Sequence, residues 1–201
     1  MKLAKFAFIL ACCAAPSFAG SVFIITVDAS SLSPGTTGFI DLAFNGGFPA
    51  TAMIDNFSNA GGSLNAPSIF TQGTVTGTLP GEVSLGNDNA DYDEGITFGP
   101  TIQFQVTLAG VPGGSVGDVF TLSFINSTLD GALLTGNVND GWLAQFQMDT
   151  AGNISATTFD NPSGGPSFAT ISLPEPSAGL LVGLALLVAL VGTRLYRART
   201  A

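Results

Sequence analysis

Apolar and polar residues alternate along the chain between residues 21 and 172, in short runs separated by Gly, Pro, Asn and Asp. Segment 101–108 shows this most clearly, because every second residue is Ile, Phe, Val or Leu and the others are Thr or Gln. A period of two places successive side chains on opposite faces of a β-strand. Strands are therefore predicted at 22–27, 39–44, 51–57, 74–79, 101–108, 119–125, 142–148, 154–159 and 168–173.

Nine or ten strands at this spacing, with no amphipathic helix between them, predict an all-β fold. We expect a single β-sandwich of jelly-roll-like form over residues 20–173, which is enough chain for one closed hydrophobic core. The region has no repeat at a fixed period and no boundary that would mark a second domain. Its clearest loop is 161–166, Asn-Pro-Ser-Gly-Gly-Pro.

Residues 1–19 have the three parts of a secretory signal peptide. Lys2 and Lys5 precede an apolar run, and the small-residue exit 17–19, Ser-Phe-Ala, follows it. Export through the Sec translocon is expected, with signal peptidase cleaving after Ala19. Both cysteines lie inside this segment, so the mature chain would have neither disulfides nor thiol chemistry.

A second apolar segment covers residues 178–192 and contains only Leu, Val, Ala and Gly. Because it has no polar face, it predicts one transmembrane helix over 178–193. At about 1.5 Å per residue this helix is shorter than a hydrocarbon core of roughly 30 Å, so flanking side chains must reach outward to the interface. Basic residues stay on the cytoplasmic side of a membrane, which leaves the tail 194–201 in the cytoplasm and the domain outside. The basic residues of this tail are Arg194, Arg197 and Arg199.

Pro174, Glu175 and Pro176 stand between the last predicted strand and this apolar run. The two prolines stop both strand and helix, so the junction is expected to be extended and accessible to a protease. Pro-Glu-Pro, a short Leu-rich span and an Arg-rich end in this order resemble the PEP-CTERM protein-sorting signal of Gram-negative bacteria, here over 174–201. The resemblance implies that an exosortase, a membrane-embedded cysteine transpeptidase-like enzyme, reads the motif and removes the tail. It also implies secretion to the surface of bacteria that make exopolysaccharide.

The domain itself resembles a small group of PEP-CTERM proteins of unassigned activity. The similar segments are V-D-x-S-S-L at 27–32, F-N-x-G-F at 44–48 and G-I-T-F-G at 95–99. This second resemblance implies no catalytic residues. The junction 173–177 also begins like the L-P-x-T-G signal of Gram-positive sortases, but Pro176 and Ser177 stand where that signal has Thr and Gly.

The charges of the chain are distributed unevenly. All five basic residues lie at the two ends, so residues 20–193 contain no Lys, Arg or His but all 14 acidic residues. Without cations the domain cannot bind nucleic acid or phosphate groups. The same inventory excludes Ser-His-Asp and Cys-His arrays, Schiff-base lysines and His-ligated zinc. Only chemistry by carboxylates alone remains, so we expect no enzyme, with a carboxylate-only glycoside hydrolase as a remote alternative.

Segment 87–95 holds the densest group of polar side chains. Asn89, Asp91 and Asp93 have the one-three-five spacing of a calcium loop, and Glu94 adds a fourth candidate ligand. Glu94, however, stands where such a loop needs Gly, so the segment also fits a solvated acidic hairpin loop. Calcium is the one candidate cofactor. The only Trp, Trp142, is interpreted as a core residue, with a sugar-stacking platform as the alternative.

These patterns predict an exported surface or extracellular-matrix protein. It would first be anchored in the inner membrane with its domain in the periplasm, and then reach the cell surface after processing by the exosortase. Acidity would keep the domain soluble, and calcium could bridge it to acidic exopolysaccharide. The alternative is a glycan- or calcium-binding module on the cell surface.

Overall fold

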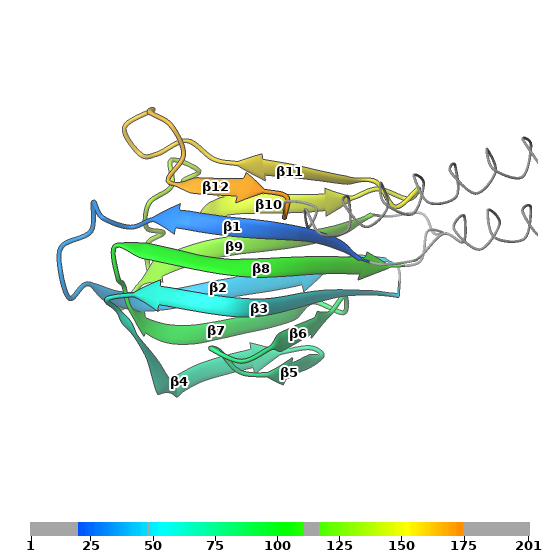
Figure 1. Cartoon of the computed structure of the whole chain (residues 1–201), viewed down its shortest axis with the longest axis horizontal. Helices are drawn as coiled ribbons and strands as arrows, with labels where there is room; N and C mark the ends of the chain where they lie inside the picture. Colours follow the sequence, from blue (N-terminus) through cyan, green and yellow to red (C-terminus); the bar gives the residue numbers. More distant parts are fainter. Residues whose placement is uncertain (1–19, 48, 111–116, 175–201) are drawn as a thin grey trace, which may run out of the picture.

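A computed structural model describes residues 20–47, 49–110 and 117–174 of the chain. These residues form two antiparallel β-sheets that pack face to face, as predicted for an all-β sandwich (Figure 1). Within the described ranges there is no helix long and apolar enough to cross a membrane. The expected signal peptide with Ala19, the transmembrane helix, the Arg tail and two residues of the sorting motif, Glu175 and Pro176, lie outside the described residues.

Each sheet has six strands. The first sheet has the order β12 (Ala169–Ser172), β1 (Ser21–Asp28), β8 (Thr101–Gly110), β3 (Ala50–Ala60), β6 (Val83–Gly86) and β5 (Val75–Gly77). The second sheet has the order β11 (Ile154–Thr158), β10 (Trp142–Met148), β9 (Asp118–Asn126), β2 (Thr37–Asn45), β7 (Ala90–Thr97) and β4 (Ser63–Gln72). Neighbouring strands are antiparallel throughout, so every described pairing can be made by hairpins or Greek-key connections.

The core lies between the sheets and follows the period of two. In β8, Ile102, Phe104 and Val106 are fully buried, whereas the Thr and Gln between them face outward. Aromatic side chains join the two layers: the ring centroids of Phe23 on β1 and Phe146 on β10 are 4.9 Å apart. The alternation therefore specifies which face of each strand is buried. Burial of these apolar faces is the main contribution to the stability of the fold.

All nine predicted strand segments are found as strands, although 74–79 is reduced to the three residues of β5. Three strands, β4, β6 and β7, were not predicted. The interpretation of 87–95 as an acidic loop is wrong, because β7 occupies most of it and pairs with β2 on one side and β4 on the other. Acidic residues disfavour strands on average, but here Asp91 and Asp93 face outward while Tyr92 and Ile96 enter the core.

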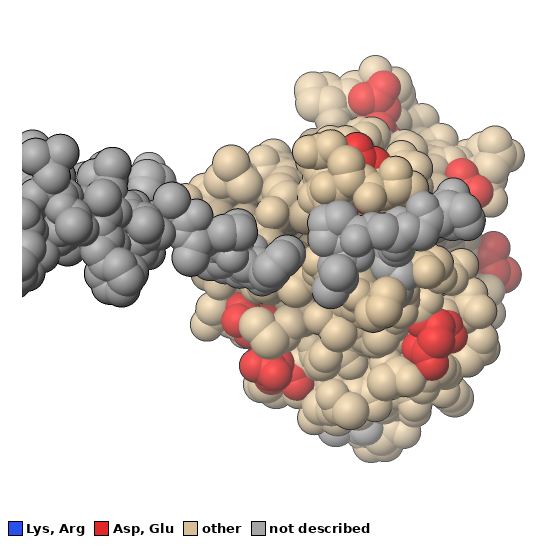
Figure 2. Space-filling view, turned by 90° about the vertical axis from the view of Figure 1, so that its right-hand side faces the viewer, with Lys and Arg blue, Asp and Glu red and all other residues tan. Residues whose placement is uncertain are grey.

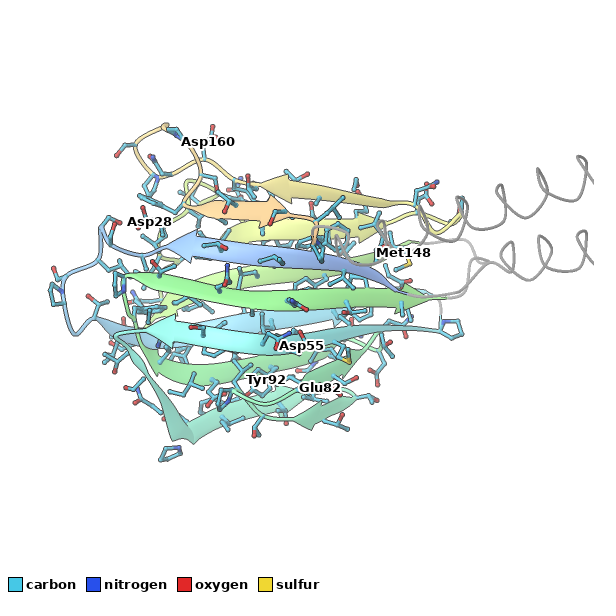
Figure 3. The ribbon with its side chains drawn as sticks, viewed as in Figure 1. Asp28, Asp55, Glu82, Tyr92, Met148 and Asp160 are labelled. Atoms are coloured by element: carbon cyan, nitrogen blue, oxygen red, sulfur yellow. The ribbon has the colours of Figure 1, made fainter. Side chains whose placement is uncertain are left out.

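One polar cluster lies inside the core, on the inner face of β7. Tyr92 and Glu94 are both completely buried, and the Tyr92 hydroxyl donates a hydrogen bond to Glu94 Oε2. The same hydroxyl accepts a hydrogen bond of 3.0 Å from the backbone N–H of Leu79. Burial raises the pKa of Glu94 and also that of Tyr92. Tyr92 (labelled in Figure 3) thus satisfies two buried polar groups at once.

We predict that Tyr92→Phe lowers the free energy of unfolding by about 1–3 kcal/mol, because it removes the buried hydroxyl that accepts from the Leu79 N–H and donates to Glu94 Oε2. Denaturant unfolding of the full-length chain measures this change. Thr51→Val is the matched control, since it removes a hydroxyl from an exposed position on β3. Equal stability of Tyr92→Phe and the wild type would contradict the role given to this hydroxyl.

Candidate functional site

Three carboxylates meet on the outer face of the second sheet. Asp41 lies on β2, and Asp91 and Asp93 lie on β7. One oxygen from each comes within 4.8 Å of the others. We call these three residues the acidic triad.

Strand register explains why the triad forms. Asp41 is paired directly with Asp93, and Asp91 lies two residues before Asp93 on the same face of β7. Ile40 and Leu42, on either side of Asp41, are fully buried, so the pleat turns Asp41 outward. Directly opposed side chains on neighbouring strands are about 4.5–5.5 Å apart at Cβ, which brings like charges into close contact.

The acidic triad is electrostatically unfavourable when fully ionised. Partial burial, then the charges of Asp93 and Asp91, raise the pKa of Asp41 to about 7, although a hydrogen bond with Ser123 opposes the shift. Burial and the charge of Asp91 raise the pKa of Asp93 to about 6. Near neutral pH the triad therefore holds protons that ordinary aspartates have lost.

The described residues contain no Lys, Arg or His that could neutralise the triad. Oδ1 of Asp91 is buried and has no hydrogen-bond partner within the described part of the chain. Two arrangements can compensate such a cluster: a shared proton, or a hard cation that takes carboxylate oxygens as ligands, as Ca²⁺ does. The residues that could hold a metal here are Asp41, Asp91 and Asp93.

The structure rearranges the calcium ligands expected from the sequence. Asp91 and Asp93 come together, but Glu94 points into the core on the opposite face of β7. Asn89 lies before β7 in a turn, with a positive φ of 59°. A calcium loop could direct all four side chains at one ion. In a strand, alternate residues face opposite sides, so Glu94 cannot join Asp91 and Asp93.

Asp41 is the member of the triad that sequence reasoning missed. A signal was present, because Asp41 is an isolated charge within the apolar strand 39–44. Its partner strand β7 was not predicted, so no register could bring Asp41 next to Asp93.

Trp142 lies at the start of β10 and is partly buried. Its ring is 6.2 Å from that of Phe159, measured between centroids, at an angle of 57°. Trp142 therefore packs at the margin of the sandwich and supports a second aromatic ring.

The remaining carboxylates are dispersed. Figure 2 shows separate acidic side chains over the pole of the domain that it faces, and no Lys or Arg among the described residues there. Several are held by local hydrogen bonds that lower their pKa: Asp149, for example, accepts from Asn153 through both its side-chain amide and its backbone N–H, each at 2.8 Å. These turn carboxylates are structurally satisfied, unlike the triad.

Comparisons with known proteins found no relative: no family model, no curated protein and no solved structure matches this chain.

We predict that Asp41→Asn stabilises the chain at pH 8 when a chelator is present. The pKa of Asp41 is raised on folding, so its contribution to stability is greatest below pH 3.8 and is lost as the pH rises through about 7. Removing this group should raise the free energy of unfolding at pH 8 by about 1–3 kcal/mol and flatten its decline between about pH 4 and pH 8. Denaturant unfolding over a pH series measures both effects.

Asp55→Asn is the control for this variant, because Asp55 (labelled in Figure 3) lies on β3 in the first sheet, whereas the triad lies on the second. It should leave the shape of the pH profile unchanged. A decline that is equally steep in wild type and Asp41→Asn would rule out the triad as its cause.

Proposed function

We propose that this chain is an exported surface or matrix protein whose acidic β-domain is released or attached outside the cell by an exosortase acting at 174–176. The observation that supports this most is the position of the motif relative to β12. Strand pairing ends at Ser172, which is opposite Ile24, and Leu173 beyond it is 68% exposed. The motif therefore begins directly where the folded domain stops, and a processing enzyme can take hold of it without unfolding a strand.

The direction of β12 is consistent with attachment at one pole. β12 runs antiparallel to β1, so the chain leaves the domain toward the pole at which β1 begins (Figure 1). The first and last described residues, Gly20 and Pro174, next to which the two expected processing points lie in the sequence, are then on the same side of the domain. The loops at the opposite pole would face away from the membrane.

Acidity supports an extracellular, non-enzymatic role. A domain without basic residues stays soluble and repels its own copies, and it can approach acidic exopolysaccharide only through a cation. The sheet order also supports the finer assignment of a jelly-roll-like sandwich: β1-β8-β3-β6 in one sheet and β2-β7-β4 in the other follow a double Greek key.

A second candidate function, calcium binding at the surface, is favoured by the acidic triad. Its three carboxylates lie close enough to share one ion. An ion would offset both the burial of charge and the repulsion that raise the pKa of Asp41. Calcium would also provide the bridge to acidic polysaccharide.

We predict that the native host releases a chain that lacks both 1–19 and the residues after the Pro-Glu-Pro motif, and that the C-terminal loss requires the exosortase. Intact-mass measurement of the protein from strains with and without that enzyme is the test. A tail retained in both strains would show a permanently anchored protein and refute the processing proposal.

The motif itself is tested by the double variant Pro174→Ala/Pro176→Ala, which should keep its tail in the strain that has the enzyme. The matched control is Pro34→Ala/Pro100→Ala, two exposed prolines outside the motif. Normal processing of the motif variant would show that the enzyme reads other residues.

For the second candidate, we predict that Ca²⁺ raises the melting temperature of the wild type at pH 8, by about 2–4 °C for each kcal/mol of binding free energy. Asp41→Asn should lose most of this gain, whereas Asp55→Asn should keep it. A melting temperature that is the same in Ca²⁺ and in chelator would exclude the triad as a calcium site.

A further inference from the structure

A shallow cavity lies between two loops beside the edge of the second sheet. One loop connects β9 to β10, and the other connects β11 to β12. The cavity measures about 480 Å³, within the range of roughly 300–1,000 Å³ that small-molecule sites occupy. It is lined by Gly136, Asn137, Asp140, Phe159, Asp160, Asn161, Pro162 and Gly164.

The second loop is held in one shape by Asn161. Its side-chain Oδ1 accepts hydrogen bonds from the backbone N–H of Ser163 at 2.8 Å and of Gly165 at 3.1 Å. Its Nδ2 donates to the carbonyl of Pro166 at 3.1 Å. Both ends of the Asn161 side-chain amide are therefore used in hydrogen bonds within the loop. Asn161 fixes the shape of the cavity, and other lining residues must contact a ligand.

The first loop is ordered in the same way by Thr135, which is buried. The Thr135 hydroxyl donates to the carbonyl of Trp142 at 2.6 Å and accepts from the N–H of Asn137 at 3.1 Å. The two loops are joined where the N–H of Gly136 donates to the carbonyl of Asp160 at 2.7 Å. A Cβ at Gly136 would lie 2.8 Å from the carbonyl oxygen of Asn161, so only glycine permits this approach. A wall formed in advance lowers the entropic cost of binding.

The lining combines one aromatic ring with hydrogen-bond acceptors. Phe159 provides the apolar surface, and Trp142 supports it from outside the cavity. Asp140 and Asp160 add carboxylates, and within the described residues the carboxylate of Asp160 accepts no hydrogen bond. Asp140 Oδ2 accepts from the Asn137 side-chain amide at 3.4 Å and has lone pairs to spare. An apolar ring next to carboxylate acceptors suits a ligand with C–H faces and hydroxyl donors, which is the chemistry of a sugar.

The charge of the cavity selects among sugars. Neither its lining nor any other described residue is a Lys, Arg or His, so a uronate, sulfate or phosphate group would meet two carboxylates and no cation. An uncharged saccharide avoids this repulsion and can donate its hydroxyls to Asp140 and Asp160.

We propose that the cavity between the loops 136–140 and 159–164 binds an uncharged saccharide unit, which packs on Phe159 and donates hydroxyl hydrogen bonds to Asp160 and Asp140. The inference rests on the proposed extracellular role for where the ligand is met, but it involves neither the sorting motif nor the triad. Loss of processing and loss of saccharide binding are therefore separate outcomes.

The test is saturation-transfer NMR and calorimetric titration of the full-length chain, held in a detergent without a sugar head group and in chelator. The probes are neutral gluco-, galacto- and manno-oligosaccharides, with an oligogalacturonate as the charged counterpart. We expect at least one neutral probe to bind with a dissociation constant of about 1 mM or tighter, and the oligogalacturonate not to bind. No binding by any neutral probe, or equal binding of the charged probe, overturns the proposal.

Variants locate the binding. Phe159→Leu and Asp160→Asn should each weaken it about tenfold or more, since one removes the ring and the other a charged acceptor. Glu82→Gln removes the same charge at an exposed position far from the cavity and should bind as the wild type does (Figure 3). Circular dichroism and melting of each variant show whether the fold is kept. Binding that survives both cavity variants would place the saccharide elsewhere and overturn the assignment.

Discussion

The fold must accommodate all of its carboxylates without a single cationic side chain between residues 20 and 193. Ion pairs within the domain are therefore excluded, and each acidic group needs another form of compensation. At turns, backbone N–H groups, amides and hydroxyls provide it: Asp88 accepts two hydrogen bonds from Thr74, and Asp130 accepts from Asn126 and Thr128. These bonds favour the ionised form and lower the pKa of both groups. Turns are thus the places where this composition can carry negative charge at little cost.

Where acids enter strands, the compensation is incomplete. β7 carries carboxylates on both faces, with Glu94 inside the core against Tyr92, and Asp91 and Asp93 outside, next to Asp41 of β2. The pKa of each of Asp41, Asp93 and Glu94 is raised, which means that folding opposes their ionisation. Because folding opposes ionisation on both faces of β7, the stability of the second sheet depends on pH.

Much of the sandwich follows from the sequence because period two is a local property. Segments such as 39–44 and 101–108 show it without knowledge of their partners, and the structure confirms them as β2 and β8. β7 was not predicted from the sequence because its outward residues are acidic, and a run of acidic residues is also typical of loops. The triad and the cavity could not be predicted for a different reason. Asp41 meets Asp93 only through strand register, and Gly136 meets Asp160 only through the packing of two distant loops.

Because β12 pairs with β1, the first sheet cannot be completed until the C-terminal end of the domain is present. The first strand of the domain receives its last neighbour from residues 169–172, so the N–H and C=O groups on that side of Ile24 to Val27 stay unpaired until the C-terminal end arrives. Exposed strand edges recruit other chains. A chain that stops before residue 169 would therefore leave this edge of β1 open, whereas a chain that continues through residue 172 covers it with β12. Under the proposed processing at 174–176, the enzyme would act only on residues that follow β12, so cleavage would leave the pairing of β12 with β1 intact.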